Sequence, residues 1–251
     1  MRLVALQSGS AGNCLYVEAG PVRLLIDAGI SGVQAQRRLA ALGVDICSVD
    51  ALLITHDHSD HVASAGILHR RYGLPLHLTR ATHDASAHRL GGLRRASHFR
   101  AGDALRFGGV TVETIPTPHD AADGVAFIVD DGISRLGIFT DLGHCFDGLR
   151  VLETCDGALV ESNFDPAMLA SGPYPPALQR RIAGPGGHLS NHEAAELLAR
   201  HGRRLRWACL GHISGDNNTP QLALATCRAA VGDGLPLSTT DRAAASAPLE
   251  L

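Results

Sequence analysis

Three histidines and two aspartates are crowded into residues 56–61, directly after the apolar run Ala51–Ile54. A short continuous apolar run predicts a strand covered on both faces, so this polar stretch begins where a buried strand ends. With 14 histidines in 251 residues, the pattern H-x-H-x-D-H is expected roughly 0.003 times by chance. The stretch constrains the fold strongly, because the chain must supply a partner for many polar groups beside a core.

The spacing within this stretch predicts metal binding. His56 and His58 can converge on one point once the backbone leaves the strand, whereas Asp60 and His61 are adjacent at a helix start and can face a second point. Neutral imidazoles with a hard carboxylate suit zinc, manganese or iron(II). Four ligands so close together are too many for one open catalytic ion, so we expect two divalent ions (Zn²⁺, Mn²⁺ or Fe²⁺).

Single polar residues close three further apolar runs. In α/β folds, the ends of strands are where sites are placed. Alone, each residue is compatible with an ordinary loop position, but together they can complete a two-ion site. The three are His119 after Val110–Ile115, Asp141 after Arg135–Phe139, and His212 after Leu205–Leu210.

The order of predicted elements indicates an α/β fold. Strands joined by hairpins come first, and strand–helix units follow, in each half of the chain. Ser31 caps a predicted helix that ends at Gly43, and Asp60 is placed to cap a second helix that runs to Gly73. We expect one domain over residues 1–251, with the small, polar segment 233–251 partly loose.

Composition narrows the function classes. The net charge of −3 does not indicate a nucleic-acid or membrane-surface protein. The six cysteines form no C-x-x-C pair, which argues against a thiolate zinc site or a disulfide framework and favours free thiols in the cytoplasm. No segment has the pattern of a signal peptide or the apolar length of a membrane span, so no membrane partner is expected.

The series H-x-H-x-D-H, His119, Asp141, His212 resembles the metallo-β-lactamase superfamily over nearly the whole chain. The stretches SGSAGNCLYVE, TPHDAADGVAF, ESNFD and GHISGDNNTP resemble a narrower branch, the YycJ/WalJ-type proteins, small bacterial metallohydrolases described as single-domain 5′→3′ DNA exonucleases. The order ESN, GHLSN, AAELL is also similar to tRNA 3′-processing endonucleases (RNase Z). The resemblance implies a four-layer αβ/βα sandwich of two mixed sheets flanked by helices.

The resemblance also implies roles for individual residues. One ion would be held by His56, His58 and His119, the second by Asp60, His61 and His212, with Asp141 bridging them. Asp27 in LLIDAG would lie behind the histidine loop. His188 in GHLSN would stand by the scissile bond as a general acid oriented by Asp60 or Glu161, while a metal-bridged hydroxide attacks phosphorus. His144 and His192 have no counterpart.

Substrate contacts have weaker signals. Four basic clusters could neutralise phosphates or could be solvated helix faces: His69–Gly73, His88–Arg100, Gln179–Gly184 and Arg200–Arg206. Tyr174 in the GPYPP loop could stack on a base. Ser8 and Asn13 lie in a Gly/Ser-rich loop whose N–H groups could bind an anion, and Asn217 is a further candidate.

The features together favour a dinuclear metal-dependent phosphodiesterase, a 5′→3′ exonuclease with single-stranded DNA as its partner. The alternative is a small-molecule hydrolase of the same superfamily, acting on a cyclic nucleotide, a thioester or a lactone. A third reading, a non-catalytic metal-binding or regulatory protein, is disfavoured by the complete ligand series. The superfamily's long inserted cap of the β-CASP nucleases is absent, so local loops would have to grip a nucleic acid.

Overall fold

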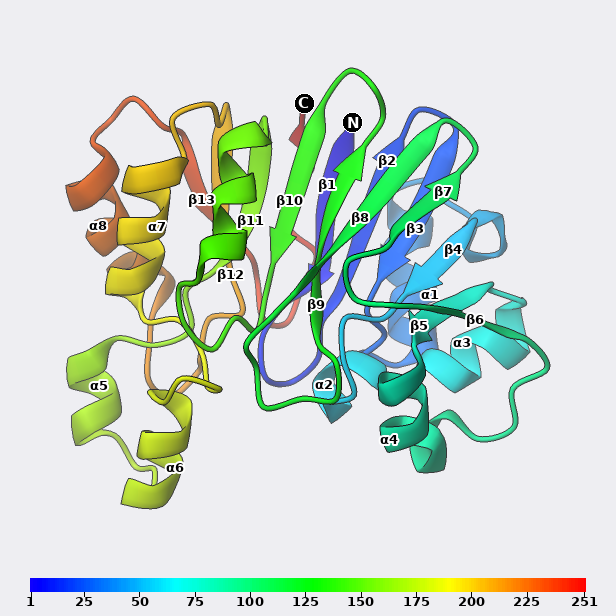
Figure 1. Cartoon of the computed structure of the whole chain (residues 1–251), viewed down its shortest axis with the longest axis horizontal. Helices are drawn as coiled ribbons and strands as arrows, with labels where there is room; N and C mark the ends of the chain where they lie inside the picture. Colours follow the sequence, from blue (N-terminus) through cyan, green and yellow to red (C-terminus); the bar gives the residue numbers. More distant parts are fainter.

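A computed structural model describes all 251 residues. Two seven-stranded mixed sheets face one another, and helices cover their outer faces (Figure 1). In spatial order the first sheet consists of β14 (Leu249–Glu250), β1 (Arg2–Gln7), β2 (Cys14–Ala19), β3 (Val22–Ile26), β4 (Ala51–Leu53), β5 (Leu76–Thr79) and β6 (Ala96–Phe99). The second consists of β13 (Leu237–Thr239), β12 (Trp207–Gly211), β11 (Gly157–Glu161), β10 (Arg135–Phe139), β9 (Val125–Asp130), β8 (Val110–Pro116) and β7 (Ala104–Phe107).

Apart from β14, which comes from the C-terminal end and pairs with β1, the first sheet is built from residues 2–99 and the second from residues 104–239, each with its own helices. The helices of the first half are α1 (Gly32–Ala41), α2 (Ser59–Val62), α3 (Ala65–Tyr72) and α4 (Arg80–Leu90). Those of the second half are α5 (Pro166–Ser171), α6 (Pro176–Ile182), α7 (Asn191–His201) and α8 (Pro220–Val231). Two 3₁₀ helices cover Ile46–Ser48 and Asp147–Thr154. Within each sheet the hairpin strands pair antiparallel and the later strands pair parallel, as the sequence predicts.

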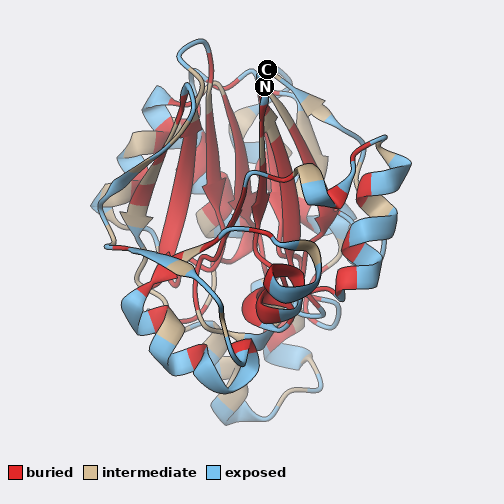
Figure 2. Ribbon diagram, turned by 90° about the vertical axis from the view of Figure 1, so that its right-hand side faces the viewer, coloured by how far each residue is buried: buried red, intermediate tan, exposed pale blue.

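Alternation along the strands builds the core on both faces of each sheet. In β2, Leu15 and Val17 point into the layer between the sheets, where they meet Phe127 from the second sheet. Tyr16 points the other way, into the layer under α1 and α3. A third buried cluster lies under α7 and α8. Figure 2 shows the buried strands enclosed by exposed helix surfaces. The predicted four-layer sandwich is confirmed.

Local structure departs from the sequence predictions in places. Ser31 caps α1 as predicted, through a hydrogen bond from the Gln34 N–H. The predicted helix from the histidine stretch to Gly73 is divided into α2 and α3, and His58 rather than Asp60 occupies the cap position of α2. At the break, the Ser64 N–H donates to the Ala28 carbonyl, which ties the helix pair to the end of β3.

Two segments hold more structure than expected. The Gly/Pro-rich stretch around Tyr174 is flanked by α5 and α6, which stand apart from the sheets in Figure 1. The segment 233–251, expected to be partly loose, supplies β13 and β14, and the Leu251 N–H donates to the Met1 carbonyl. The structure contains no helix with the length and apolarity that crossing a membrane requires.

Candidate metal centre

Three site residues lie one or two positions beyond strand ends and have left-handed backbone conformations. Asp27 (φ 64°) follows β3, Asp141 (φ 57°) follows β10, and His212 (φ 53°) follows β12. Only one other non-glycine residue, Asp123, has a positive φ. This conformation is uncommon for residues with a side chain, and it persists where the surrounding structure enforces it. The conformation takes each side chain out of the strand's pleat at one end of the sandwich.

The first donor cluster contains His56, His58 and His119, whose nitrogens lie within 4.8 Å of one another. Nδ1 of His58 is 3.2 Å from Nε2 of His119. Nε2 of His56 is buried and has no hydrogen-bond partner. Around a tetrahedral zinc ion, ligand nitrogens are about 3.3 Å apart, from bonds of about 2.0–2.1 Å. The spacing of the His58 and His119 nitrogens, and the buried His56 nitrogen that lacks a hydrogen bond, fit a metal ion.

The second donor cluster contains Asp60, His61 and His212. Oδ2 of Asp60 is 3.5 Å from Nε2 of His61 and 3.4 Å from Nε2 of His212. Asp141 lies between the two clusters: Oδ2 is 3.1 Å from Nε2 of His61, and Oδ1 is 3.8 Å from Nε2 of His119. The Asp141 Oδ2 atom is buried and forms no hydrogen bond, so it too fits a cation. The buried donor sets are consistent with a dinuclear site.

Hydrogen bonds behind the donors fix the orientation of the rings. Nδ1 of His61 donates to Oδ2 of Asp27 at 2.7 Å, and Asp27 also accepts the N–H and O–H of Thr55. Nδ1 of His119 donates to the Gly187 carbonyl at 2.8 Å. Each bond consumes Nδ1 and leaves Nε2 facing the cluster, which is how ligand histidines are held in metalloproteins. Asp27 thus lies behind the histidine loop, hydrogen-bonded to His61 and Thr55.

Electrostatics keep the carboxylates of the cluster ionised. Burial raises the pKa of Asp141, but His212 and His61 lower it more, and the net pKa is well below the usual range. Burial lowers the pKa of His212, but Asp141, Asp60 and Glu161 raise it to about 10. Against the effect of burial, Asp141 and Asp27 likewise raise the pKa of His61 well above its usual range, whereas burial lowers the pKa of His56 and His119. A bound cation would displace the extra protons of His61 and His212.

His188 is paired with Glu161. Nδ1 of His188 donates to Oε1 of Glu161 at 2.7 Å and lies 3.5 Å from Oδ1 of Asp141. Oε2 of Glu161 accepts the backbone N–H groups of Leu142 and Leu189, so the carboxylate cannot swing away. Burial raises the pKa of Glu161, but the neighbouring His188 more than offsets this effect, and the net pKa is about 2. Of the two expected partners of His188, Glu161 makes the hydrogen bond, whereas Asp60 faces His61 and His212.

Three of the four expected substrate contacts are buried. Oγ of Ser8 accepts the His212 N–H, and Nδ2 of Asn13 lies 3.0 Å from Nε2 of His61 and 3.3 Å from Oδ2 of Asp60. Asn217 is also enclosed. These side chains are enclosed by the protein and do not face the pocket. The sequence shows that the loop is polar, but it does not show in which direction the side chains point. Tyr174 is partly exposed, and its O–H donates to Asp216.

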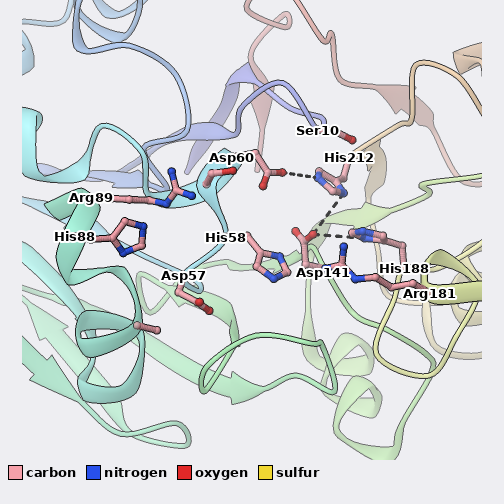
Figure 3. A pocket seen from close by; sticks show the side chains of 12 residues that line it. Ser10, Asp57, His58, Asp60, His88, Arg89, Asp141, Arg181, His188 and His212 are labelled. Carbon is pink, nitrogen blue, oxygen red and sulfur yellow. Dashed lines mark hydrogen bonds and ion pairs between the residues drawn. The ribbon is translucent and has the colours of Figure 1, made fainter. Parts of the chain in front are cut away.

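A pocket of about 430 Å³ opens over the two donor clusters (Figure 3). Two of the predicted basic clusters reach it, with His88 and Arg89 from α4 and Arg181 from α6. The other two do not: Arg70 donates to the Leu90 carbonyl, and Arg200 lines a separate depression. Ser10, Asp57 and Ser59 also line the pocket, and the sequence had not singled them out. In the sequence, the basic clusters had indicated His88, Arg89 and Arg181, whereas no pattern had indicated Ser10, Asp57 or Ser59 as pocket residues.

Fold and donor set define a metal-dependent hydrolase with a dinuclear-type site. Residues 8–168 match the metallo-β-lactamase superfamily model, and the chain belongs to that superfamily. The exodeoxyribonuclease YycJ of Bacillus anthracis is 35% identical over 87% of this chain and 84% of its own. WalJ of Streptococcus pneumoniae, also named an exodeoxyribonuclease, is 37% identical over 87% of this chain and 83% of its own. The predicted superfamily and branch are confirmed.

More distant similarities agree. A ribonuclease Z of Mycobacterium sp. (strain KMS) is 31% identical over 76% of this chain and 75% of its own. The crystal structure of YhfI from Bacillus subtilis, a metallo-β-lactamase fold protein, superposes with a TM-score of 0.76 at 16% identity, covering 98% of this chain and 99% of that one. At this identity the match supports the fold alone.

Proposed function

We propose that this protein is a dinuclear metal-dependent phosphodiesterase that degrades single-stranded DNA from the 5′ end. The names of the relatives support DNA as substrate. The observation that carries the proposal is the His188–Glu161 pair at the mouth of the donor clusters, since hydrolysis of a phosphodiester needs a proton for the leaving oxygen.

In this proposal each donor cluster holds one divalent ion, Zn²⁺, Mn²⁺ or Fe²⁺. His56, His58 and His119 would hold the first, Asp60, His61 and His212 would hold the second, and Asp141, which lies between the two clusters, would be available to both. Bound there, divalent ions supply an activated water and neutralise the charge that develops on the phosphate oxygens. Asp27 and Thr55 keep the His61 ring in register through the bonds described above.

His188 performs the proton transfer. Because its Nδ1 proton is committed to Glu161, the imidazole can deliver a proton only from Nε2. Glu161 is fully buried and anchored by two backbone N–H groups, so it fixes the direction of the ring. A general acid must carry the transferred proton beforehand, and the hydrogen bond from Nδ1 to Glu161 aims Nε2 for that transfer. Delivery to the leaving 3′ oxygen completes the cleavage.

His188→Ala tests this role. The variant should lose at least about 100-fold in turnover of 5′-phosphorylated single-stranded DNA, the usual size of a general-acid contribution, while it keeps the wild-type metal content. His192→Ala is the matched control, because His192 is exposed on α7. Metal content is measured by plasma emission spectrometry and turnover on a labelled oligonucleotide. Unchanged turnover in His188→Ala would discard the assigned role.

A substrate panel tests the reaction itself. The wild-type protein should shorten a 3′-labelled, 5′-phosphorylated oligonucleotide stepwise and should hydrolyse bis(p-nitrophenyl) phosphate more slowly. Hydrolysis of thioesters, lactones or cyclic nucleotides without action on DNA would support the small-molecule alternative instead.

A further inference from the structure

Two arginines stand on opposite walls of the pocket, with the donor clusters between them. Arg89 projects from α4, which packs on the first sheet, and Arg181 from α6, which belongs to the second half of the chain. In Figure 3, Arg89 and His88 lie on one side of His58 and Asp141, and Arg181 lies with His188 on the other. We propose that these arginines bind the phosphates that flank the scissile phosphodiester, one on each side. This inference rests on the proposed function.

Arg181 is positioned for such a contact by an ion pair. Its Nε donates to Oδ2 of Asp120 at 2.6 Å, and no bond occupies its terminal nitrogens. Asp120 follows His119, and its N–H donates to the Gly186 carbonyl, so the pair is tied to the loops that carry His119 and His188. Helix α6 has no buried residue. Because packing of α6 constrains Arg181 little, it is the ion pair with Asp120 that directs the Arg181 guanidinium toward the pocket.

Arg89 is the opposite case, a cation with no partner. Its side chain is exposed near the end of α4, forms no ion pair or hydrogen bond in the structure, and lines the pocket beside His88. Many surface arginines lack partners, and its place on the pocket wall is what sets it apart. A guanidinium that faces the donor clusters without an internal carboxylate is free to bind a phosphate.

The remaining lining decides what kind of substrate fits. One of the 12 lining residues is hydrophobic, and none is Phe, Tyr or Trp. The large aromatic side chains of base-stacking platforms are missing from this lining, and the two guanidinium groups offer contacts to phosphates. The substrate class is thus an oligonucleotide with phosphates on both sides of the cleaved bond, recognised without base preference. A lone phosphodiester or a lactone cannot use both walls.

The test compares substrates with and without flanking phosphates. Arg89→Ala and Arg181→Ala are assayed on a homopolymeric single-stranded oligonucleotide and on bis(p-nitrophenyl) phosphate, which has none. For each variant the ratio of kcat/KM on DNA to kcat/KM on the small ester should fall about tenfold, the effect of losing one charge-assisted hydrogen bond. The slope of log kcat/KM against log salt concentration should become shallower by about one. Arg180→Ala, next to Arg181 but outside the pocket lining, should change neither.

Two results would overturn the subsite. An unchanged ratio would mean that the arginines do not contact flanking phosphates, and an equal fall on both substrates would mean that they act on the centre itself. Failure of the proposed function looks different, because the wild-type protein would then cleave no DNA while it hydrolysed another ester.

Discussion

At the scale of single residues, the buried polar side chains around the donors matter as much as the donors. Asn13 contacts both Asp60 and His61, and Ser8 holds the backbone of His212. These residues were expected to touch the substrate. Their burial instead gives them the task of holding ligand side chains at the correct separation, which is where outer contacts of metal sites act.

Asn13→Ala separates the two roles. The variant should bind metal about 10- to 100-fold more weakly, the usual effect of losing an outer hydrogen bond at a metal site, because the Asp60 carboxylate loses the Asn13 amide that lies 3.3 Å from its Oδ2. At saturating metal its KM for DNA should stay near the wild-type value. Competition with a chromophoric chelator measures the affinity. A raised KM with unchanged metal affinity would show that Asn13 contacts the substrate instead.

The limits of the sequence are clearest at this scale. H-x-H-x-D-H is local, and the end of a buried strand predicts where His119, Asp141 and His212 gather. Arg89 and Arg181 could not be chosen among many arginines, because neighbours across the pocket are distant in sequence. The direction of Asn13 depends on how its loop folds against α2, which no local pattern encodes.

At the scale of elements, the end of β3 is packed without clearance against α2 and the loop before it. A Cβ atom on Gly29 would lie 1.7 Å from the Asp60 carbonyl oxygen. The Gly29 N–H donates to the Asn13 carbonyl, and the Ala28 N–H to the His61 carbonyl. The close approach explains why the predicted helix is divided: the short α2 is fixed by β3, and α3 starts anew.

Gly29→Ala should therefore destabilise the protein and disturb the second donor cluster together. We expect a loss of at least about 2 kcal/mol in the free energy of unfolding, as for overpacking in a rigid site. Gly109→Ala, where a Cβ meets no atom within 4 Å, is the matched control. Urea denaturation measures the free energy of unfolding of the two variants. Equal stability of the two variants would show that the backbone of Asp60 and α2 can move to admit the extra methyl group at little energetic cost.

At the scale of the whole molecule, the donors come from both halves of the chain. His56, His58, Asp60 and His61 follow β4 of the first sheet, whereas His119, Asp141 and His212 follow β8, β10 and β12 of the second. The strand ends that carry the donors thus lie at the same end of the sandwich. Ligands that are far apart in the sequence therefore come together in one site. Element order predicted the α/β class because hairpins and strand–helix units recur in each half, whereas the four-layer sandwich was implied by the family resemblance. Helices α5 and α6 were missed, since a Gly/Pro-rich stretch reads as a loop.

Seven side chains from both halves of the chain are placed to hold two cations. Anomalous diffraction from crystals grown with Mn²⁺ or Zn²⁺ tests it most directly. We predict two anomalous peaks, one bonded to His56, His58 and His119, the other to Asp60, His61 and His212, with Asp141 bonded to both. A single peak, or peaks bonded to other residues, would show that these seven side chains do not hold two cations.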